Sequence, residues 1–162
     1  MKTKHVSESY IETNDIVHPA DANAYGIVFG GHLVSLMDKA ACMSAFKHAE
    51  AKVTTVSVDS IYFQHPAPIG TMLSLKAAVN RVFHSSMEVG IKVTGWRPHE
   101  KETEICTAYM TFVALDENNK PTPVPEIIPE TEDEKRRFEN AEIRRDARLA
   151  LRDKLRKKNT SP

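Results

Sequence analysis

The chain has 162 residues, of which 41% are hydrophobic and 27% are charged. This length predicts one domain, since two would be cramped. Its 22 basic residues balance 22 acidic ones, and this zero net charge argues against a nucleic-acid partner. No apolar run approaches the ~18–20 residues that span a bilayer, and the first residues lack the apolar core of a signal peptide. We therefore predict a soluble, cytoplasmic protein without a membrane partner.

The chemistry-bearing residue types exclude several classes of site. Cys42 and Cys106 lie in apolar surroundings, where reduced, buried thiols are expected, although one disulfide stays the alternative. The seven histidines show no His-Glu-x-x-His spacing and no Cys-x-x-Cys pair accompanies them, so we predict no metal site. The Gly-x-Ser-x-Gly elbow, the phosphate loop and the dinucleotide fingerprint are also missing.

The first elements are a strand and a turn-rich loop. Residues 7–17 alternate imperfectly between polar and apolar side chains, which predicts an irregular or edge strand. Pro19 ends it, because proline cannot continue a hydrogen-bonded ladder. The following loop, 20–29, contains Asn23, whose side chain is typical of turns.

A helix is predicted from Gly30-Gly31 to about Ala49. Its apolar and small residues cover most of the circumference, which is typical of a buried helix. Asp38 is the exception on this helix. If its carboxyl group is buried, it has to be hydrogen-bonded, paired or protonated, because an isolated buried charge is costly.

Four strands and a second helix complete the chain. The strands are expected at Val53–Phe63, Met72–Phe83, Met87–Trp96 and Thr103–Leu115, with His84-Ser85-Ser86 as one turn. Their short connections predict an antiparallel meander, so one sheet wraps one helix in an α+β domain over residues 1–120.

Residues 121–130 are rich in proline and are interpreted as a linker. Residues 131–162 are predicted to form a charged helix and tail, which begins with a capping box between Thr131 and Glu134. We expect this helix to lie along its own domain or a sister subunit. The basic residues near its end leave contacts to nucleic acid or to CoA phosphates as the alternative.

The loop and the start of the first helix together indicate acyl transfer to water. Free N–H groups at a helix N-terminus can hold a developing oxyanion, and glycines at Gly30 and Gly31 let a substrate come close. Asp38 would then act as general base or nucleophile, with Asn23 orienting water or the carbonyl group. Each signal has a plainer alternative: a steric role for the glycines and a turn role for Asn23.

The segment Asn23-Ala-Tyr-Gly-Ile-Val-Phe-Gly-Gly-His-Leu-Val-Ser-Leu-Met-Asp38 resembles the signature of hotdog-fold acyl-CoA thioesterases of the cytosolic acyl-CoA hydrolase type. The resemblance continues through 53–63, 85–89 and 108–116 and into the C-terminal segment. It implies a hotdog fold, a dimer, and further assembly into a trimer of dimers. It also implies that acyl-CoA is hydrolysed to a free acid and CoA without a metal or another cofactor.

The resemblance also assigns roles to individual residues. It places Asn23 of one subunit against Asp38 of the other, with the N–H groups near Gly30 and Gly31 on the thioester carbonyl. It places the substrate-binding residues of the CoA moiety on one strand and one turn: Thr55, Val56 and Ser57 beside the pantetheine arm, and His84, Ser85 and Ser86 near the phosphates. Many relatives carry Gly-Arg or Gly-Lys where this chain has Phe83-His84.

Two other functions are compatible with the same fold. One is a non-catalytic regulator that binds acyl-CoA without turning it over. The other is a dehydratase or hydratase acting on acyl thioesters, for which His32 could supply the required histidine. Asn23 and Asp38 match the thioesterase pattern better, and we therefore favour hydrolysis.

Overall fold

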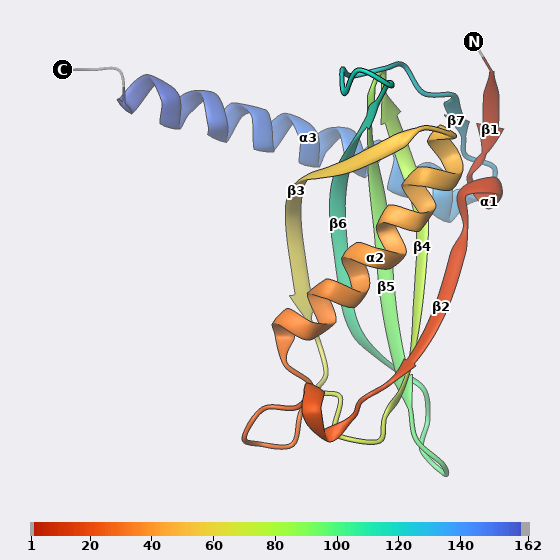
Figure 1. Cartoon of the computed structure of the whole chain (residues 1–162), viewed down its shortest axis with the longest axis vertical. Coiled ribbons are helices and arrows are strands. Elements are labelled where there is room, and N and C mark those ends of the chain that lie inside the picture. Colours follow the sequence, from red (N-terminus) through yellow and green to blue (C-terminus); the bar gives the residue numbers. More distant parts are fainter. Residues whose placement is uncertain (1, 160–162) are drawn as a thin grey trace.

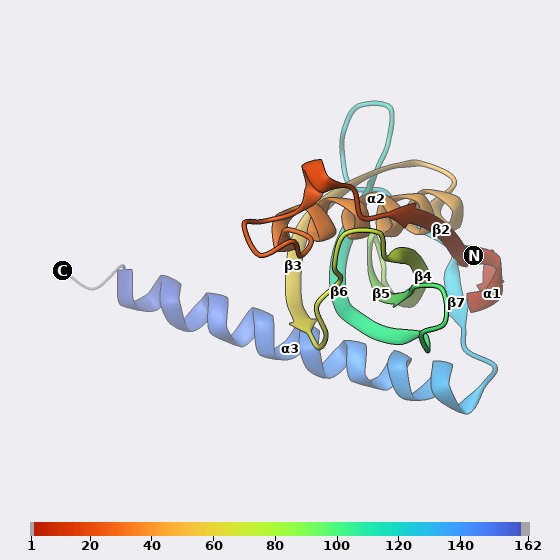
Figure 2. The same ribbon diagram turned by 90° about the horizontal axis from the view of Figure 1, so that it is seen from below.

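The computed structural model describes residues 2–159; residues 160–162 of the predicted C-terminal tail lie outside the described part of the chain. One five-stranded antiparallel sheet separates two long helices, α2 and α3, which lie on opposite faces (Figure 1, Figure 2). The strands, in their spatial order, are β2 (Ile11–Ile16), β4 (Met72–Phe83), β5 (Ser86–Trp96), β6 (Thr103–Leu115) and β3 (Lys52–Phe63). The predicted α+β hotdog architecture, a sheet curled around a central helix, is confirmed.

The inner face of the sheet packs against α2 (Gly30–Ala49), whose bounds match the prediction. Alternate residues of each strand point inward because side chains on a strand change sides at every residue. The buried inner residues include Leu75, Val79, Met87, Val89, Met110 and Phe112. They meet Leu33, Met37, Ala40 and Ala41 of α2. These two apolar surfaces form the core that fixes the position of α2.

The beginning of the chain differs from the prediction of one strand over 7–17. A short strand β1 (Thr3–His5) is followed by one helical turn, α1 (Val6–Ser9), and only then by β2. The turn closes because the Ser9 hydroxyl donates to the carbonyl of Val6 at 2.7 Å, while the Glu8 carboxylate accepts from the N–H of His5 at 2.7 Å. Such local side-chain bonds to the backbone compete with a strand ladder.

The strand order also corrects the predicted meander. Only β4, β5 and β6 are joined as consecutive neighbours, whereas β3 pairs with β6 at the far edge. The connection from β3 to β4, residues 64–71, contains two prolines and a glycine and is long enough to pass from one side of the sheet to the other. In the predicted linker, β7 (Glu126–Ile128) pairs in parallel with β1.

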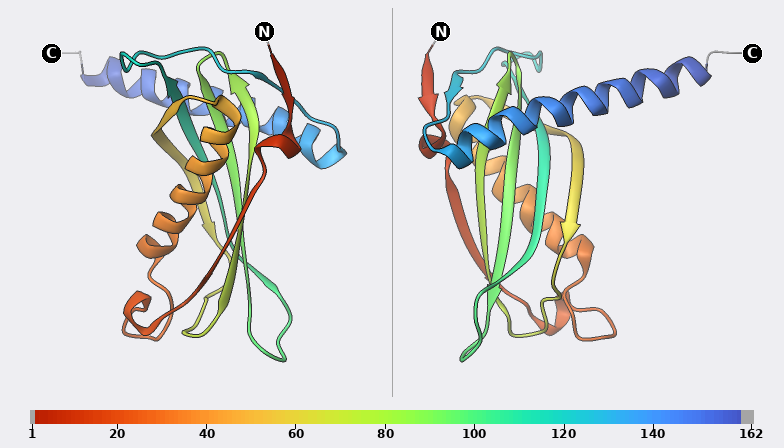
Figure 3. Two further views of the ribbon diagram at one scale, coloured as in Figure 1. Left: turned by 45° about the vertical axis from the view of Figure 1, so that its right-hand side comes forward. Right: turned by 180° about the vertical axis from the view of Figure 1, so that it is seen from behind.

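Helix α3 (Glu132–Asn159) crosses the outer face of the sheet, and its last turns extend beyond the edge strand β3 (Figure 3). Its predicted capping box is present. The Thr131 hydroxyl accepts from the N–H of Glu134 at 3.2 Å, and the Glu134 carboxylate accepts from the N–H of Thr131 at 3.0 Å. Within residues 2–159, no helix is both long and apolar enough to cross a membrane.

Candidate active site

The N-terminus of α2 is an uncapped helix end. Its N-cap residue is Phe29, which provides no side-chain hydrogen bond to the first turn, although a helix leaves its first N–H groups without intrahelical acceptors. Gly30 and Gly31 are the first two helical residues. A side chain at Gly30 would place its Cβ 3.4 Å from the ring of Phe63, whereas the space beside Gly31 is open. The backbone at Gly31 is therefore accessible to a ligand.

A mostly apolar cavity of about 390 Å³ adjoins this helix end. It is lined by Gly30 and Leu33 of α2, by Phe63 at the end of β3, and by the segment 64–67 with Ile105. A volume of this size, with apolar walls and a few polar groups, is typical of a small-molecule site. Phe63 and Ile105 were not among the sequence candidates; the position of Phe63 at a strand end beside Pro66 is the signal that could have identified it.

Asn23 belongs to the loop beside the same helix end. Its side-chain oxygen accepts from the N–H groups of Tyr25 at 2.9 Å and Ile27 at 3.3 Å. The loop is tied to the helix entry, since the N–H of Phe29 donates to the carbonyl of Asp21 at 2.8 Å. Asn23 thus has the turn role predicted as the plainer alternative, and these contacts leave its amide nitrogen available for another partner.

Asp38 lies further along α2 and is half-buried. Its carboxylate accepts a hydrogen bond of 2.9 Å from the hydroxyl of Thr55 on β3. This bond fixes one carboxylate oxygen and leaves the other for a proton or a substrate. Thr55 was predicted as a substrate-binding residue, and in the folded chain it also orients the predicted catalytic acid.

The remaining CoA-binding candidates lie at the same end of the sheet as Thr55. Ser86 pairs with Val113, which pairs with Thr54, so two strand spacings, or about 10 Å, separate Ser86 from Thr54. His84 is exposed, has a φ angle of 63° in the turn between β4 and β5, and lines a cavity of about 380 Å³ together with Arg81. The carbonyls of His84 and Ser85 accept from Val124 and Ala114 and hold this turn in place.

The side chains of residues 55–57 on β3 point in different directions. The Ser57 hydroxyl donates to the carboxylate of Asp59 at 2.6 Å, whereas the hydroxyl of Thr55 points toward α2. Val56, between them, is 54% exposed on the free edge of the sheet. The Thr55 side chain therefore faces α2, Val56 lies exposed at the sheet edge, and Ser57 contacts Asp59.

One chain thus contains two separate groups of predicted site residues. Asn23, Gly30 and Gly31 lie at the start of α2, whereas Asp38 and the CoA-binding candidates lie further along it. Asp38 follows Gly30 by eight residues, which places it about 12 Å away along the helix axis. A thioester carbonyl bound at Gly31 would therefore be out of reach of Asp38 in the same chain.

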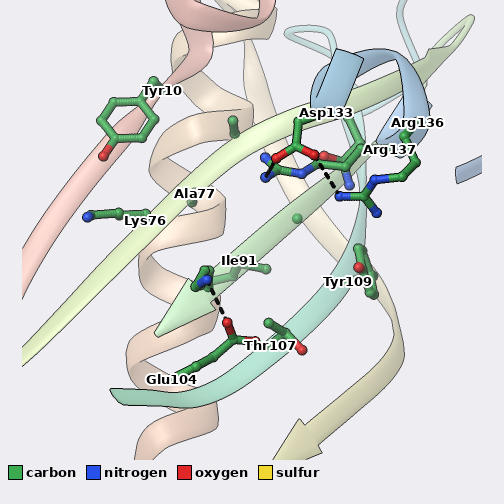
Figure 4. Close-up of a pocket in the computed structure, with 14 residues that line it drawn as sticks. Tyr10, Lys76, Ala77, Ile91, Glu104, Thr107, Tyr109, Asp133, Arg136 and Arg137 are labelled. Carbon is green, nitrogen blue, oxygen red and sulfur yellow. Dashed lines mark hydrogen bonds and ion pairs between the residues drawn. The ribbon is translucent and has the colours of Figure 1, made fainter. Parts of the chain in front are cut away.

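A second cavity, of about 540 Å³, lies on the outer face of the sheet under the first turns of α3 and contains none of the predicted site residues (Figure 4). Its cationic side chains already have carboxylate partners: Lys92 contacts Glu104 at 2.5 Å, and Arg136 contacts Asp133 at 3.1 Å. The apolar cavity at Gly30 fits an acyl thioester better, because its walls match an acyl chain.

The two cysteines are free thiols, as predicted. Burial raises the pKa of Cys106 to about 11. Burial also raises the pKa of Cys42, and the neighbouring Asp38 carboxylate adds to that shift. Both thiols are therefore protonated near neutral pH and are poor nucleophiles. Among residues 2–159, no group of three or more His, Cys, Asp or Glu side chains could hold a metal ion.

Comparison with known proteins decides the family. A family model for the thioesterase superfamily matches residues 25–96. A Bacillus subtilis protein named as an acyl-CoA thioester hydrolase is 40% identical over 134 residues, which cover 82% of this chain and 78% of that protein. The chain belongs to the thioesterase superfamily. The prediction made from the segment 23–38 is thereby confirmed.

Two solved structures resemble this thioesterase over almost its whole length. An acyl-CoA hydrolase from Staphylococcus aureus, determined in complex with butyryl coenzyme A, coenzyme A and coenzyme A disulfide, has a TM-score of 0.90 at 36% identity, with 96% of each chain covered. A hexameric acyl-CoA thioesterase in its apo form has a TM-score of 0.90 at 35% identity and covers 93% of this chain and 97% of its own. Both include the α3 region of the fold, since the aligned part exceeds the first 120 residues.

Proposed function

We propose that this thioesterase hydrolyses acyl-CoA to a free carboxylic acid and CoA. The observation that carries the proposal is the uncapped helix end at Gly30 and Gly31, which opens beside an apolar cavity. The carbonyl oxygen of the thioester would accept hydrogen bonds from these N–H groups, and the acyl chain would lie against Leu33 and Phe63. N–H groups aimed at a developing oxyanion stabilise the tetrahedral intermediate.

Asp38 supplies the second part of the chemistry. As general base it would take a proton from water as the water attacks the carbonyl carbon, and it would pass that proton to the leaving sulfur as the C–S bond breaks. As nucleophile it would attack that carbon itself and displace CoA, which would take a proton from water, and a second water would then hydrolyse the acyl anhydride to release the acid and restore Asp38. Thr55 holds the carboxylate through its 2.9 Å hydrogen bond, and no metal or other cofactor enters the proposed reaction.

The active site is proposed to form between two subunits. The distance of about 12 Å between Gly30 and Asp38 along one helix supports a site in which the second subunit brings Asp38 to the first subunit's helix end. Asn23 would then face the partner's carboxylate. Without a partner, each chain carries two half-sites.

The edge strand supports such a dimer. One side of β3 has no neighbouring strand among the described residues, and an unpaired edge favours pairing with another strand. Large apolar side chains are exposed along it and on the adjoining part of α2: Met43, Phe46, Val56, Val58, Tyr62 and Phe63. A second copy that covers this surface would bury these side chains, and contiguous exposed apolar side chains of this kind mark interaction sites. The hexameric relative supports further assembly into a trimer of dimers.

The CoA moiety is proposed to run along β3 at 55–57, with its phosphates near the turn at His84, Ser85 and Ser86. Two unpaired thiols suit a reducing compartment, which supports the predicted cytoplasmic location. Release of free thiol from acyl-CoA distinguishes this function from a regulator that only binds the ligand, and from a hydratase, which leaves the thioester intact.

Mixing two inactive variants tests the composite site. Asp38→Ala and Asn23→Ala should each lower kcat, by about 10³-fold for Asp38→Ala, within the range for loss of a general base. Subunits exchanged between the two variants would form mixed dimers with one intact site, so activity should recover to a substantial fraction of the wild-type value. Thiol release by Asp38→Ala at the wild-type rate would refute the function, and a mixture without recovery would refute the shared site.

A further inference from the structure

A row of polar residues crosses the outer face of the sheet. Arg81 on β4 pairs with Glu88 on β5, Glu88 pairs with Thr111 on β6, and Thr111 pairs with Ser57 on β3. Asn80 adds a hydrogen bond of 2.9 Å to Glu88. The row runs from β4, the neighbour of the edge strand β2, to the opposite edge strand β3, which carries Thr55.

Helix α3 follows this row from one end to the other. Glu142 contacts Arg81 at 2.9 Å, and Arg144 forms two hydrogen bonds with Glu88, at 2.9 and 2.7 Å. One turn later, the guanidinium of Arg148 forms an ion pair with Asp59 on β3 and donates a hydrogen bond of 2.7 Å to Thr111. Buried groups are matched in this way because an unpaired buried charge is costly.

Asp59 lies in an irregular part of β3. The pairing of β3 with β6 shifts register between Thr55 and Ser57, and again between Val58 and Ser60. The first shift has a direct consequence for the site: Thr55 pairs with the buried, inward Phe112, whereas Ser57 pairs with the outward Thr111. A bulge thus aims Thr55 at α2 and Ser57 at the opposite face, which is the kind of reorientation that bulges provide near active sites.

The carboxylate of Asp59 connects both bulges to the outer face. It accepts from the Ser57 hydroxyl at 2.6 Å and from the Thr111 hydroxyl at 3.0 Å, and only 6% of its side-chain surface is exposed. Arg148 is the cation that balances this buried charge. Without it, Asp59 would have to gain access to water, and the strand would have to move.

We propose that Arg148 is a positioning residue for the active-site strand. Through Asp59 it holds the bulged geometry that aims Thr55 at Asp38, so α3 supports the catalytic acid across the thickness of the sheet. This inference rests on the proposed function for its effect on turnover, but not for its effect on β3. It gives the predicted C-terminal helix a role in the reaction in addition to covering the sheet.

Hydrogen exchange tests the structural half of the proposal. In Arg148→Gln, amide exchange in the peptide that covers residues 54–60 should be faster than in the wild type. The matched control is Glu142→Gln, which removes the ion pair with Arg81 at the other end of the same row. Exchange in 54–60 should be unchanged in this control, and equal effects in the two variants would overturn the proposal.

A double-mutant cycle with Thr55 tests the catalytic half. With the acyl-CoA that the wild type turns over fastest, from acetyl to palmitoyl, Arg148→Gln should lower kcat about tenfold, as expected when a reacting group is slightly misplaced. In a Thr55→Val background the same change should have an effect below about twofold, since residues that act through one contact are not additive. Glu142→Gln should keep the wild-type kcat.

The outcomes separate the two proposals. A wild-type protein that releases no thiol would refute the proposed function, while faster exchange in 54–60 would still support the role of Arg148. An active wild type with unchanged kcat in Arg148→Gln, or with the same loss in both backgrounds, would refute the positioning role. If Arg148→Gln does not fold, Asp59→Asn takes its place in both measurements, because it removes the same ion pair and keeps a hydrogen-bond acceptor.

Discussion

The two faces of the sheet are held against their helices by different physical interactions. The inner face meets α2 through apolar contacts between fully buried residues such as Phe112 and Met37. The outer face meets α3 through ion pairs and stacking, among them Arg144 with Glu88 and Arg144 over the ring of Tyr109 at 3.6 Å. Apolar burial is non-directional and scales with area, whereas charged hydrogen bonds depend on geometry.

The inner face therefore contributes mainly to the stability of the fold, whereas the outer face determines how α3 and β3 are positioned. Burial of a large apolar side chain stabilises the fold by about 1.5–3 kcal/mol, so the inner face supplies most of the folding energy. A buried ion pair adds little net stability over an apolar pair of the same size. The outer row instead specifies where α3 lies and how β3 is bulged, and the following predictions test that division.

Truncation of a side chain on the inner face should lower the free energy of unfolding the most. Phe112→Ala removes a fully buried ring from the core and should lower the free energy of unfolding by about 3–5 kcal/mol. Tyr109→Ala, on the same strand but facing α3, is the matched comparison and should cost clearly less, because the ring is only half-buried. Urea denaturation measures both, and equal losses would contradict the division between the faces.

Removing one charge from the outer row should have an intermediate effect. Arg144→Gln leaves Glu88, which is 2% exposed, without its cation and should cost about 2 kcal/mol, less than a fully buried pair because Arg144 is partly exposed. Adding Glu88→Gln removes the unpaired charge and keeps an acceptor for Asn80. This double variant should therefore regain at least about half of the lost stability. A further loss in the double variant would show that the pair itself contributes net stability.

A buried histidine should produce the smallest effect, confined to acidic pH. Burial lowers the pKa of His48; its Nε2 lies 2.8 Å from the carbonyl oxygen of Pro125, and its Nδ1 has no hydrogen-bond partner among the described residues. Below about pH 6.5 the unfolded chain binds a proton that the folded chain does not, so the free energy of unfolding should fall as the pH falls through that value.

The variant His48→Gln keeps a donor for the Pro125 carbonyl and should have a flatter pH dependence of stability below about pH 6.5. The variant His65→Gln, at an exposed position, is the control for the His→Gln change itself. Denaturation midpoints measured above and below this pH give the pH dependence of stability for each protein. An identical pH dependence in the wild type and both variants would exclude His48 as its source.

Much of the local structure follows from the sequence. The bounds of α2 and β4 agree with the prediction to the residue, because apolar periodicity and the glycine or proline residues at the ends are local signals. The segment 23–38 likewise indicated the family, and it singled out Asp38 as the predicted catalytic acid. The prediction was wrong for 7–9, where side-chain bonds to the backbone form a helical turn in place of a strand.

Long-range relations were beyond this kind of prediction. The pairing of β3 with β6 depends on how the sheet closes, and the bulges at 55–60 depend on which residues face each other across two strands. The contact between Asp59 and Arg148 joins residues 89 positions apart. None of these long-range contacts produces a periodic sequence pattern from which it could be predicted.

By itself, the sequence determined where the central helix and the four strands after it begin and end, and which acid lies in that helix, because each of these depends on residues within a few positions of one another. Only the tertiary structure decided that the hydroxyl of Thr55 meets the carboxylate of Asp38 and that α3 reaches the strand carrying Thr55. Those relations depend on packing and on hydrogen-bond geometry between segments far apart in the chain, which form only when the sheet closes around α2.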